Sequence, residues 1–230
     1  MIFAIILSGG VGSRMGADIP KQYIEVNGKP IISYCLQTFL NVQTIDGIII
    51  GVAEEWKSYV EEKTKALKPQ KKIFYAEPGE TRQYSIFNAL KVVYDIGGRD
   101  DDLVIIHDAA RPLVSDPLIH RCFDGCQEAD GVLPVIPIKD TIYQSTDKTH
   151  ISNLLNRNEL FAGQAPEAFR FGKYLQLHQE MTREELLKIN GSTEIAYKGG
   201  LNIKLIPGEE MNFKITTPED LSNFESIINK

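Results

Sequence analysis

The sequence predicts a single-domain α/β protein with a mostly parallel twisted sheet and helices on both of its faces. Two observations predict this class: strand-like apolar runs alternate with amphipathic segments, and no linker, repeat or low-complexity tract divides residues 1–230. With 43% hydrophobic residues, the chain is long enough to bury one sizeable core. The expected strands are 3–7, 45–52, 72–76, 103–107, 132–138 and 203–206.

Helices are expected between these strands, and two of them begin with strong capping signals. Ser115 and Thr217 each offer a hydroxyl as an N-cap, and Pro117 and Pro218 follow them in the first helical turn together with early acidic residues. The expected helices are 30–40, 54–67, 81–94, 116–128 and 218–228.

Residues 139–160 depart from the strand–helix alternation. They alternate polar and apolar side chains around a Ser-Thr-Asp-Lys turn at residues 145–148, which predicts a β-hairpin. A hairpin with so little core of its own is expected to project from the body of the domain and to pack on a partner. We therefore predict a homodimer joined through this arm.

Charge and cysteine content exclude several classes of partner. The formal net charge of -6 argues against a nucleic-acid polymer. No apolar run reaches the roughly 18 residues that a membrane span needs, and we expect no targeting segment because the chain leads directly into a strand. Cys35, Cys122 and Cys126 are odd in number and lack the companions of a zinc site, which indicates core thiols and a cytoplasmic protein.

The first predicted strand ends in a loop, residues 8–16, that contains four glycines. Glycines let backbone N–H groups approach a phosphate closely, and Arg14 and Lys21 add two cations. Together they predict a polyphosphate site. The loop lacks the Gly-Lys-Ser/Thr ending of phosphate-loop ATPases, and its glycine spacing is one residue longer than that of the dinucleotide fingerprint.

Two further polar clusters follow predicted strands, where open α/β sheets bind ligands. Residues 77–85 form a turn entering a helix; its backbone amides and Ser85 offer hydrogen bonds to a base or sugar, and Arg82 is expected to anchor the loop. A carboxylate at the end of a buried strand is costly unless it binds a cation or a hydroxyl. Asp108 is therefore a candidate ligand for a metal or a ribose with Arg111 as its counter-charge, and a purely structural ion pair between these two residues is the alternative.

Two other clusters carry candidate anion ligands. Asp140 and Thr141 begin the hairpin arm, and Arg157 lies near its end. Lys214 comes just before a predicted helix, where a lysine taken alone would be a solvated surface residue. His107 is expected to be a hydrogen-bonded buried histidine and not a catalytic base.

Six motifs occur in an order that resembles a known family. They are Ser-Gly-Gly-x-Gly-Ser-Arg-Met-Gly…Pro-Lys-Gln, Gly-Glu-Thr-Arg-x-x-Ser, His-Asp-Ala-Ala-Arg-Pro, Asp-Thr-Ile, Asn-Arg…Gly-Gln-Ala-Pro and Asn-Phe-Lys-Ile-Thr-Thr-Pro-Glu-Asp-Leu. They resemble the CTP-dependent cytidylyltransferases that act on 2-C-methyl-D-erythritol 4-phosphate or on ribitol 5-phosphate, and the resemblance extends from about residue 2 to residue 225. The resemblance implies a glycosyltransferase-A-like nucleotidyltransferase fold, a homodimer joined through the arm, and dependence on Mg²⁺.

The resemblance also implies roles for individual residues. The catalytic cations are expected to be Arg14, Lys21 and Lys214. The CTP ligands are expected to be Ser8, Gly9, Gly10, Gly12, Gly79, Glu80, Ser85 and Asp108. Asp108 would also face the acceptor or, as a tentative ligand, the metal. Thr141 and Arg157 resemble residues that grip the acceptor's phosphate in the neighbouring subunit's site.

Three departures from the family pattern lie toward the arm and the acceptor. The usual Gln-Thr-Pro-Gln appears as Gln-Ala-Pro-Glu at residues 164–167, and a usual Thr-Asp pair is replaced by Gly-Ser-Thr-Glu at residues 191–194. The tract from there to Lys214 is shorter than expected by about one helical turn. The nucleotide is therefore better determined by the sequence than the acceptor is.

Other acceptors and classes stay open at this point. The His-Asp-Ala-Ala-Arg-Pro-Leu motif favours methylerythritol phosphate and isoprenoid precursor synthesis, whereas Gly163-Gln164 and Glu55-Trp56 are more like the ribitol enzymes, which make CDP-ribitol for cell-surface polymers. A nucleotidyltransferase for an aldose 1-phosphate is disfavoured by the Pro-Lys-Gln signature. A non-catalytic nucleotide-binding module is disfavoured because all three catalytic cations are present.

Overall fold

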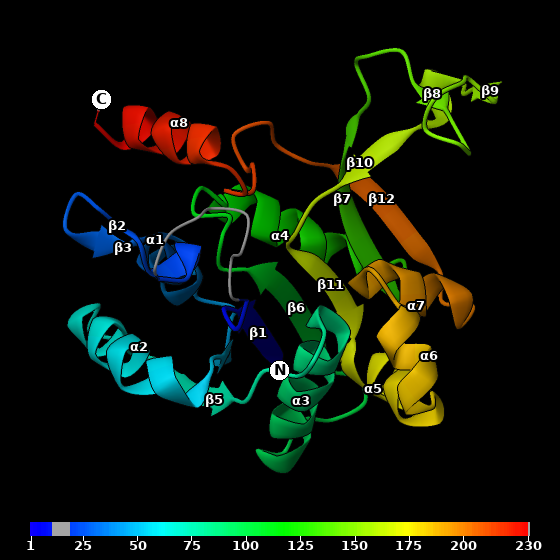
Figure 1. The fold of residues 1–230 in the computed structure, drawn as a ribbon. Coiled ribbons are helices and arrows are strands. Elements are labelled where there is room, and N and C mark those ends of the chain that lie inside the picture. The colour runs from blue at the N-terminus through cyan, green and yellow to red at the C-terminus, as the bar shows by residue number, and fades with distance from the viewer. Residues whose placement is uncertain (11–18, 230) are drawn as a thin grey trace.

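The computed structural model describes residues 1–10 and 19–229 and confirms the predicted α/β class (Figure 1). One sheet forms the centre, with the strand order β10-β7-β11-β6-β1-β4-β5 and with β12 beside β7. Its strands are β1 (Ile2–Leu7), β4 (Gly47–Gly51), β5 (Lys72–Ala76), β6 (Leu103–Asp108), β7 (Gly131–Pro137), β10 (Phe161–Gly163), β11 (Glu167–Arg170) and β12 (Ile203–Pro207).

The sheet is mixed, and its parallel part positions the site. β6, β1, β4 and β5 pair in parallel, as do β12 and β7, whereas β11 is antiparallel to β6 and β7, and β10 is antiparallel to β7. Leu7 at the end of β1 pairs with Gly51 on one side and with Asp108 on the other. Three neighbouring strands therefore end at the same edge of the sheet, and their connecting loops converge there.

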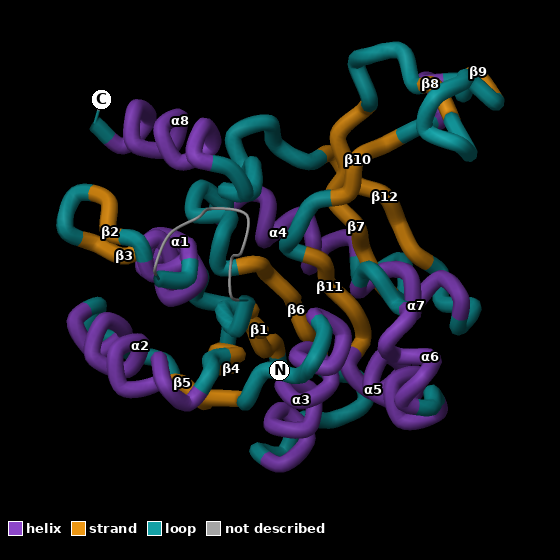
Figure 2. The backbone as a smooth tube through the Cα atoms, viewed as in Figure 1, coloured by secondary structure: helices purple, strands orange, loops and turns teal. Residues whose placement is uncertain are grey.

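Helices cover both faces of the sheet (Figures 1 and 2). Because side chains alternate along a strand, Ala4 and Ile6 pack into a cluster with α1, α2 and α4, while Phe3 and Ile5 pack into a second cluster with α3, α5, α6 and α7. A smaller cluster lies under α8. The helices are α1 (Ile31–Asn41), α2 (Glu54–Ala66), α3 (Arg82–Asp95), α4 (Asp116–Gly125), α5 (Phe171–Glu180), α6 (Arg183–Lys188), α7 (Ser192–Lys198) and α8 (Pro218–Ile228).

The predicted helix starts are confirmed in their capping contacts. The Ser115 hydroxyl accepts a hydrogen bond from the Leu118 N–H, and Thr217 forms a reciprocal capping box with Asp220. At its other end α4 stops at Gly125, earlier than the predicted residue 128, and continues as a turn. The antiparallel strands β10 and β11 and the short helices α5 to α7 were not predicted.

Two short hairpins complete the chain. β2 (Glu25–Val26) and β3 (Lys29–Pro30) follow a 3₁₀ turn, η2 (Lys21–Tyr23), and are joined through Asn27 and Gly28, whose φ angles of 50° and 71° suit a two-residue type I′ turn. The second hairpin is the arm. Over residues 1–10 and 19–229, no helix combines the length and apolarity that crossing a membrane requires.

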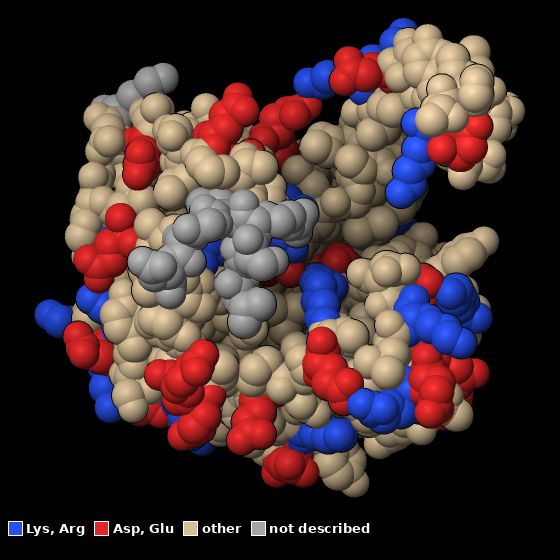
Figure 3. Space-filling view, viewed as in Figure 1, with Lys and Arg blue, Asp and Glu red and all other residues tan. Residues whose placement is uncertain are grey.

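The arm, residues 139–160, projects from the body as predicted (Figures 1 and 3). β8 (Tyr143–Gln144) and β9 (Asn153–Leu154) pair as a separate two-stranded sheet, and the 3₁₀ turn η3 (Arg157–Glu159) leads back to the body. The arm exposes large apolar side chains: Tyr143 is 58% exposed, Ile151 67% and Leu154 61%. A single chain therefore leaves this apolar surface facing solvent.

Candidate active site

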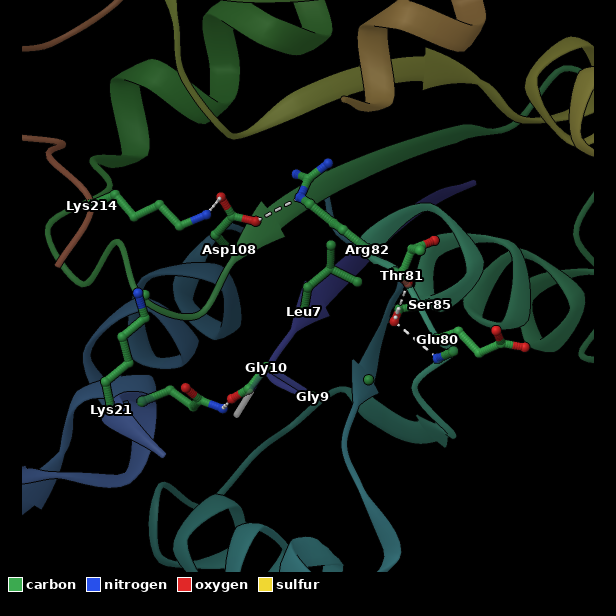
Figure 4. Close-up of a pocket in the computed structure, with 14 residues that line it drawn as sticks. Leu7, Gly9, Gly10, Lys21, Glu80, Thr81, Arg82, Ser85, Asp108 and Lys214 are labelled. Carbon is green, nitrogen blue, oxygen red and sulfur yellow. Dashed lines mark hydrogen bonds and ion pairs between the residues drawn. The ribbon is translucent and has the colours of Figure 1, made fainter. Parts of the chain in front are cut away.

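A cavity of about 460 Å³ lies where β1 and β6 end (Figure 4). Strand ends, the start of the glycine-rich loop, the turn before α3 and the loop before α8 all contribute to it, so segments far apart in the sequence meet there. Its lining residues are Leu7, Gly9, Gly10, Lys21, Gln22, Gly51, Gly79, Glu80, Thr81, Arg82, Ser85, Asp108, Ala110 and Lys214.

The described part of the glycine-rich loop is fixed by side chains from η2. The Gln22 amide nitrogen donates to the backbone oxygens of Ser8 and Gly10, and the Tyr23 hydroxyl donates to the Ser8 oxygen at 3.0 Å. Tyr23 itself stacks on Trp56, with ring centroids 4.8 Å apart. These donors therefore hold the backbone carbonyls at residues 8 and 10, where the loop begins. No role was predicted for Gln22 or Tyr23 from the sequence.

Ser8 is a supporting residue of this loop and does not line the cavity. It is buried, and its backbone N–H and its hydroxyl both donate to the Gly51 oxygen, at 2.9 and 2.8 Å. Ser8 therefore joins the end of β1 to the end of β4. The predicted loop residues Gly12 and Arg14 lie outside the described residues.

Packing excludes a side chain at two glycines around the turn before α3. A Cβ atom at Gly9 would overlap the ring of Pro78, and one at Gly79 would overlap Tyr84. The Ser85 hydroxyl accepts from the Gly79 N–H at 3.0 Å and donates to the Thr81 oxygen at 3.0 Å. Ser85 thus fixes the turn, and glycine at 9 and 79 is required by packing.

Asp108 is the electrostatic centre of the pocket. Arg82 Nε donates to its Oδ1 at 3.0 Å and Lys214 Nζ donates to its Oδ2 at 2.9 Å, whereas Arg111 Nε lies 3.9 Å from Oδ2. Burial alone would raise the pKa of the Asp108 carboxyl, but Arg82 and Lys214 hold it well below its ordinary value. The carboxylate is therefore ionised whenever the protein is folded near neutral pH.

These contacts add detail to two of the roles predicted from the sequence. Arg111 is a counter-charge of Asp108 as predicted, at 3.9 Å, but Arg82 and Lys214 lie closer to the carboxylate, and the Arg111 guanidinium also donates to the Asn212 oxygen at 2.7 Å. Arg82 anchors its turn as predicted, and it does so by contacting Asp108 at the end of β6. Sequence proximity favoured Arg111, and the tertiary fold brings two distant cations closer.

The environment of Asp108 also differs from that of a prepared metal ligand. Both of its oxygens accept hydrogen bonds from cationic side chains, so a metal ion at this carboxylate would lie beside the positive charges of Arg82 and Lys214. Within the described ranges, 1–10 and 19–229, no cluster of three or more His, Cys, Asp or Glu residues is arranged to hold an ion. The donor set therefore does not fit a metal held by the protein alone.

Behind Arg82 lies a buried carboxylate that sequence analysis did not assign to the site. Glu167, at the start of β11, is 8% exposed, and its Oε1 lies 3.5 Å from Arg82 Nη2. Ser192 and Thr193 at the start of α7 donate to its two oxygens at 2.9 and 2.7 Å. The altered segments 164–167 and 191–194 therefore meet at this point.

The remaining predicted residues fall in different places. The carboxylate of Glu80 pairs with Arg183 at the rim of the cavity, where it is 61% exposed. Thr141 and Arg157 lie on the arm and do not line the cavity of their own chain. His107 is fully buried, with its Nε2 2.9 Å from the Arg111 oxygen, as expected of a structural histidine. The three cysteines are buried free thiols, as predicted.

Comparison with known proteins decides between the classes left open by the sequence. The family model of 2-C-methyl-D-erythritol 4-phosphate cytidylyltransferase (IspD) matches residues 2–230. The chain belongs to this family. A curated relative of that name from Clostridium botulinum (strain Eklund 17B / Type B) is 34% identical over 230 residues, which cover 100% of both chains.

Solved structures agree with this assignment. The 4-diphosphocytidyl-2C-methyl-D-erythritol synthase of Anaerococcus prevotii DSM 20548 superimposes with a TM-score of 0.85 at 25% identity, covering 100% of this chain and 96% of that chain. The 2-C-methyl-D-erythritol 4-phosphate cytidylyltransferase of Francisella tularensis superimposes with a TM-score of 0.80 at 29% identity, covering 97% and 99%.

Family membership makes the protein a CTP-dependent cytidylyltransferase of isoprenoid precursor synthesis. It confirms the predicted enzyme class and the favoured acceptor, methylerythritol phosphate. The ribitol alternative, with its cell-surface polymers, is not supported by the family match. A nucleotidyltransferase for an aldose 1-phosphate and a non-catalytic module are likewise not supported.

Proposed function

We propose that the cavity at the ends of β1 and β6 binds CTP and transfers its cytidylyl group to 2-C-methyl-D-erythritol 4-phosphate, with release of pyrophosphate. The observation that carries this proposal is the convergence of Lys21 and Lys214 on one cavity that also holds Gly9 and Gly10. Two cations and a glycine loop from separate segments suit a polyphosphate and a second phosphate together.

The chemistry brings two anions together. A phosphate oxygen of the acceptor attacks the α-phosphorus of CTP. The bond between the α-phosphorus and the oxygen that bridges it to the β-phosphorus breaks, and that oxygen leaves with pyrophosphate. We assign Lys21, Lys214 and the predicted Arg14 to stabilising charge on the α-phosphate and the leaving group. The attacking oxygen is already ionised at neutral pH, so the reaction requires no general base, in keeping with the structural role of His107.

We assign the turn at residues 77–85 to the cytosine base. Gly79 faces the cavity without a side chain, and Ser85 holds the turn through the Gly79 N–H and the Thr81 oxygen. The backbone at Gly79 and Glu80 then offers hydrogen-bonding groups at fixed positions in a pocket close to the glycine loop. We propose that the close approach of Gly9 to Pro78 limits the space beside this turn and so favours a pyrimidine over a purine.

We assign Mg²⁺ to the substrate phosphates and not to a site made by the protein alone, because Arg82 and Lys214 already neutralise Asp108 and would repel a cation there. When bound to CTP, Mg²⁺ would neutralise part of the negative charge of the phosphates. In this proposal Asp108 positions Lys214 and offers an acceptor to a hydroxyl of the ribose or of the polyol.

We assign the arm to dimerisation and to the acceptor site of a second subunit. Its exposed Tyr143, Ile151 and Leu154 offer an apolar contact surface. Arg157 lies at the base of the arm, where one guanidinium nitrogen donates to the Lys139 oxygen at 3.0 Å and the others can bind a phosphate. The buried free thiols suit a reducing compartment, so we place the enzyme in the cytoplasm.

One assay tests the proposal directly. The purified protein is incubated with CTP, Mg²⁺ and a panel containing methylerythritol 4-phosphate, ribitol 5-phosphate and an aldose 1-phosphate, and pyrophosphate release is followed. We expect rapid release with methylerythritol 4-phosphate, together with a CDP-linked product seen by ³¹P NMR. Release with ribitol 5-phosphate at a higher kcat/KM would contradict the acceptor, and release without any acceptor would indicate CTP hydrolysis.

A further inference from the structure

Arg82 lies between two buried carboxylates. Its Nε donates to Asp108 Oδ1 at 3.0 Å, and its Nη2 lies 3.5 Å from Glu167 Oε1. Its third nitrogen, Nη1, donates to the Ser192 hydroxyl. Asp108 and Glu167 are each 8% exposed, so the arrangement is shielded from water. Each nitrogen of the guanidinium thus has a different partner.

Glu167 is itself held in place from behind. The Ser192 hydroxyl donates to Oε1 at 2.9 Å, and the Thr193 hydroxyl donates to Oε2 at 2.7 Å. Ser192 is in turn fixed because its backbone oxygen accepts from the Tyr174 hydroxyl at 3.0 Å. The carboxylate therefore has a defined position and can impose one on Arg82.

The position of Glu167 determines how the Arg82 guanidinium contacts Asp108. Nε and Nη2 form one edge of an arginine, and that edge can hold both oxygens of a single carboxylate. Here the edge is divided, with Nε on Asp108 and Nη2 toward Glu167. Asp108 therefore gives only Oδ1 to Arg82, and its Oδ2 is left for Lys214 Nζ at 2.9 Å.

We infer that Glu167 is a positioning residue for the transfer reaction: by drawing Nη2 of Arg82 to itself, it leaves an oxygen of Asp108 to hold Lys214 at the cavity. This inference rests on the proposed function, because it assigns the effect to the cation that acts on the phosphates. Glu167 does not line the cavity, so its effect on the reaction passes through Arg82 and Asp108.

The charges agree with this role. Burial alone would lower the pKa of the Arg82 guanidinium, but Asp108 and Glu167 hold it above its ordinary value, so Arg82 stays charged. If Glu167 were neutral, the remaining strong partner for Nη2 would be Asp108. The arginine would then take both oxygens of Asp108 and displace Lys214. The two segments that depart from the family pattern, 164–167 and 191–194, supply the carboxylate and its hydroxyl partners.

The substitution Glu167→Gln tests the inference because it keeps the shape and removes the charge. We expect kcat with methylerythritol 4-phosphate to fall about tenfold while the KM for CTP changes less than about twofold. A crystal structure of the variant should show Nε and Nη2 of Arg82 both on Asp108, with Lys214 Nζ away from Oδ2. An unchanged kcat, or an unmoved Lys214, would overturn the inference.

A double-mutant cycle separates positioning from general support of the fold. In a Lys214→Ala background, Glu167→Gln should lower the residual kcat less than about twofold, because the residue it positions is already absent. An equal tenfold loss in both backgrounds would show that Glu167 acts independently of Lys214 and would overturn the inference. If wild-type protein transfers no cytidylyl group at all, the proposed function fails instead, and that outcome is seen before any variant is compared.

Two further variants keep the test decisive. Asp102→Asn removes another buried carboxylate, 6% exposed and at the opposite end of β6, and should leave kcat unchanged even where it lowers the melting temperature. If Glu167→Gln does not yield folded protein, Thr193→Val removes only the hydrogen bond to Oε2. It should lower kcat about threefold, with the same dependence on Lys214, and a wild-type kcat would overturn the inference.

Discussion

Lys214 Nζ lies 2.9 Å from Asp108 Oδ2, although 106 residues separate the two in the sequence. The lysine belongs to the loop before α8 and the carboxylate ends β6, so the contact ties the C-terminal part of the chain to the central sheet. It also holds a cation at the cavity through a contact within the protein. A phosphate that enters the cavity meets a lysine already in position, which reduces the cost of organising the site.

Lys21→Ala tests the role of the other lysine of the cavity. We expect kcat at saturating CTP to fall by a factor of about 100 or more, because a cation facing the reacting phosphates is lost. Folding, followed by circular dichroism and thermal unfolding, should change little. Lys29→Ala is the matched control on the exposed β2–β3 hairpin. Retention of more than about a tenth of wild-type kcat would show that Lys21 has no part in the transition state.

The nucleotide preference follows from the closeness of the glycine loop and the turn at residues 77–85. We expect CTP to be preferred over UTP, and ATP and GTP to be essentially unused. The measurement is kcat/KM for each triphosphate with methylerythritol 4-phosphate held constant. Similar values for CTP and either purine nucleotide would mean that this turn does not read the base.

Gly9 and Gly10 form a matched pair that tests the packing of the loop. A Cβ at Gly9 would overlap the ring of Pro78, whereas a Cβ at Gly10 meets no atom within 4 Å among the described residues. We expect Gly9→Ala to lower the free energy of unfolding by about 1–3 kcal/mol and Gly10→Ala to change it by less than about 0.5 kcal/mol. Equal denaturation midpoints would show that the loop moves away from Pro78 without cost.

Two buried histidines make stability depend on pH. Burial lowers the pKa of His107 and that of His178 from 6.5 to about 4, so both are neutral in the folded protein at neutral pH. Between pH 6.5 and 4 the unfolded chain binds protons that the folded chain does not, and stability therefore falls as the pH falls. Each histidine should remove up to about 3 kcal/mol by pH 4.

Urea unfolding of the wild type and of His178→Gln between pH 4.5 and 8 measures this dependence. The packing that the substitution removes contributes equally at every pH, so each protein's unfolding free energy is compared with its own value at pH 8. Below pH 6.5 the variant's unfolding free energy should decline less steeply, by up to about 1.4 kcal/mol per pH unit. Parallel curves for the two proteins would contradict the burial effect at His178.

The proposed role of the arm leads to the prediction that two inactive variants restore activity when their subunits are mixed. If Arg157 of one subunit binds the acceptor phosphate in the other, Arg157→Ala should raise the acceptor KM strongly and leave CTP binding nearly intact, since losing a charge-assisted pair costs about 2–4 kcal/mol. Mixing Arg157→Ala with Lys21→Ala protein and allowing subunit exchange should restore activity, because each heterodimer holds one intact site. Absence of rescue in demonstrated heterodimers would mean that the arm does not reach across.

Residues whose local pattern matched their final environment were predicted well. β5 and α8 have the predicted bounds, because a short strand and a helix with a hydroxyl cap and proline are recognisable locally. The strands β10 and β11 are too short to show a period. The charges of the site depend on which distant residues meet: Arg111 is close to Asp108 in sequence, but Arg82 and Lys214 are closer in space.

Glu167 is a residue of the site that could not be predicted from its local sequence. Its partners Ser192 and Arg82 belong to α7 and α3, so they are distant from it in the sequence and leave no local pattern around residue 167. The signal that could have found it was the joint departure of segments 164–167 and 191–194 from the family pattern. Two changes that seem independent along the chain prove to be one change in space.

The way the arm is attached has a consequence for how this molecule can vary. Pro137 and Phe161 face one another in the β7–β10 ladder, and nearly every side chain between them is exposed or half-exposed. Folding of the body therefore depends on the pairing of β7 with β10 and hardly on the residues of the arm that connects them. Length and composition can therefore change at the turn of the arm, residues 145–148, without disturbing the sheet or the geometry of the cavity.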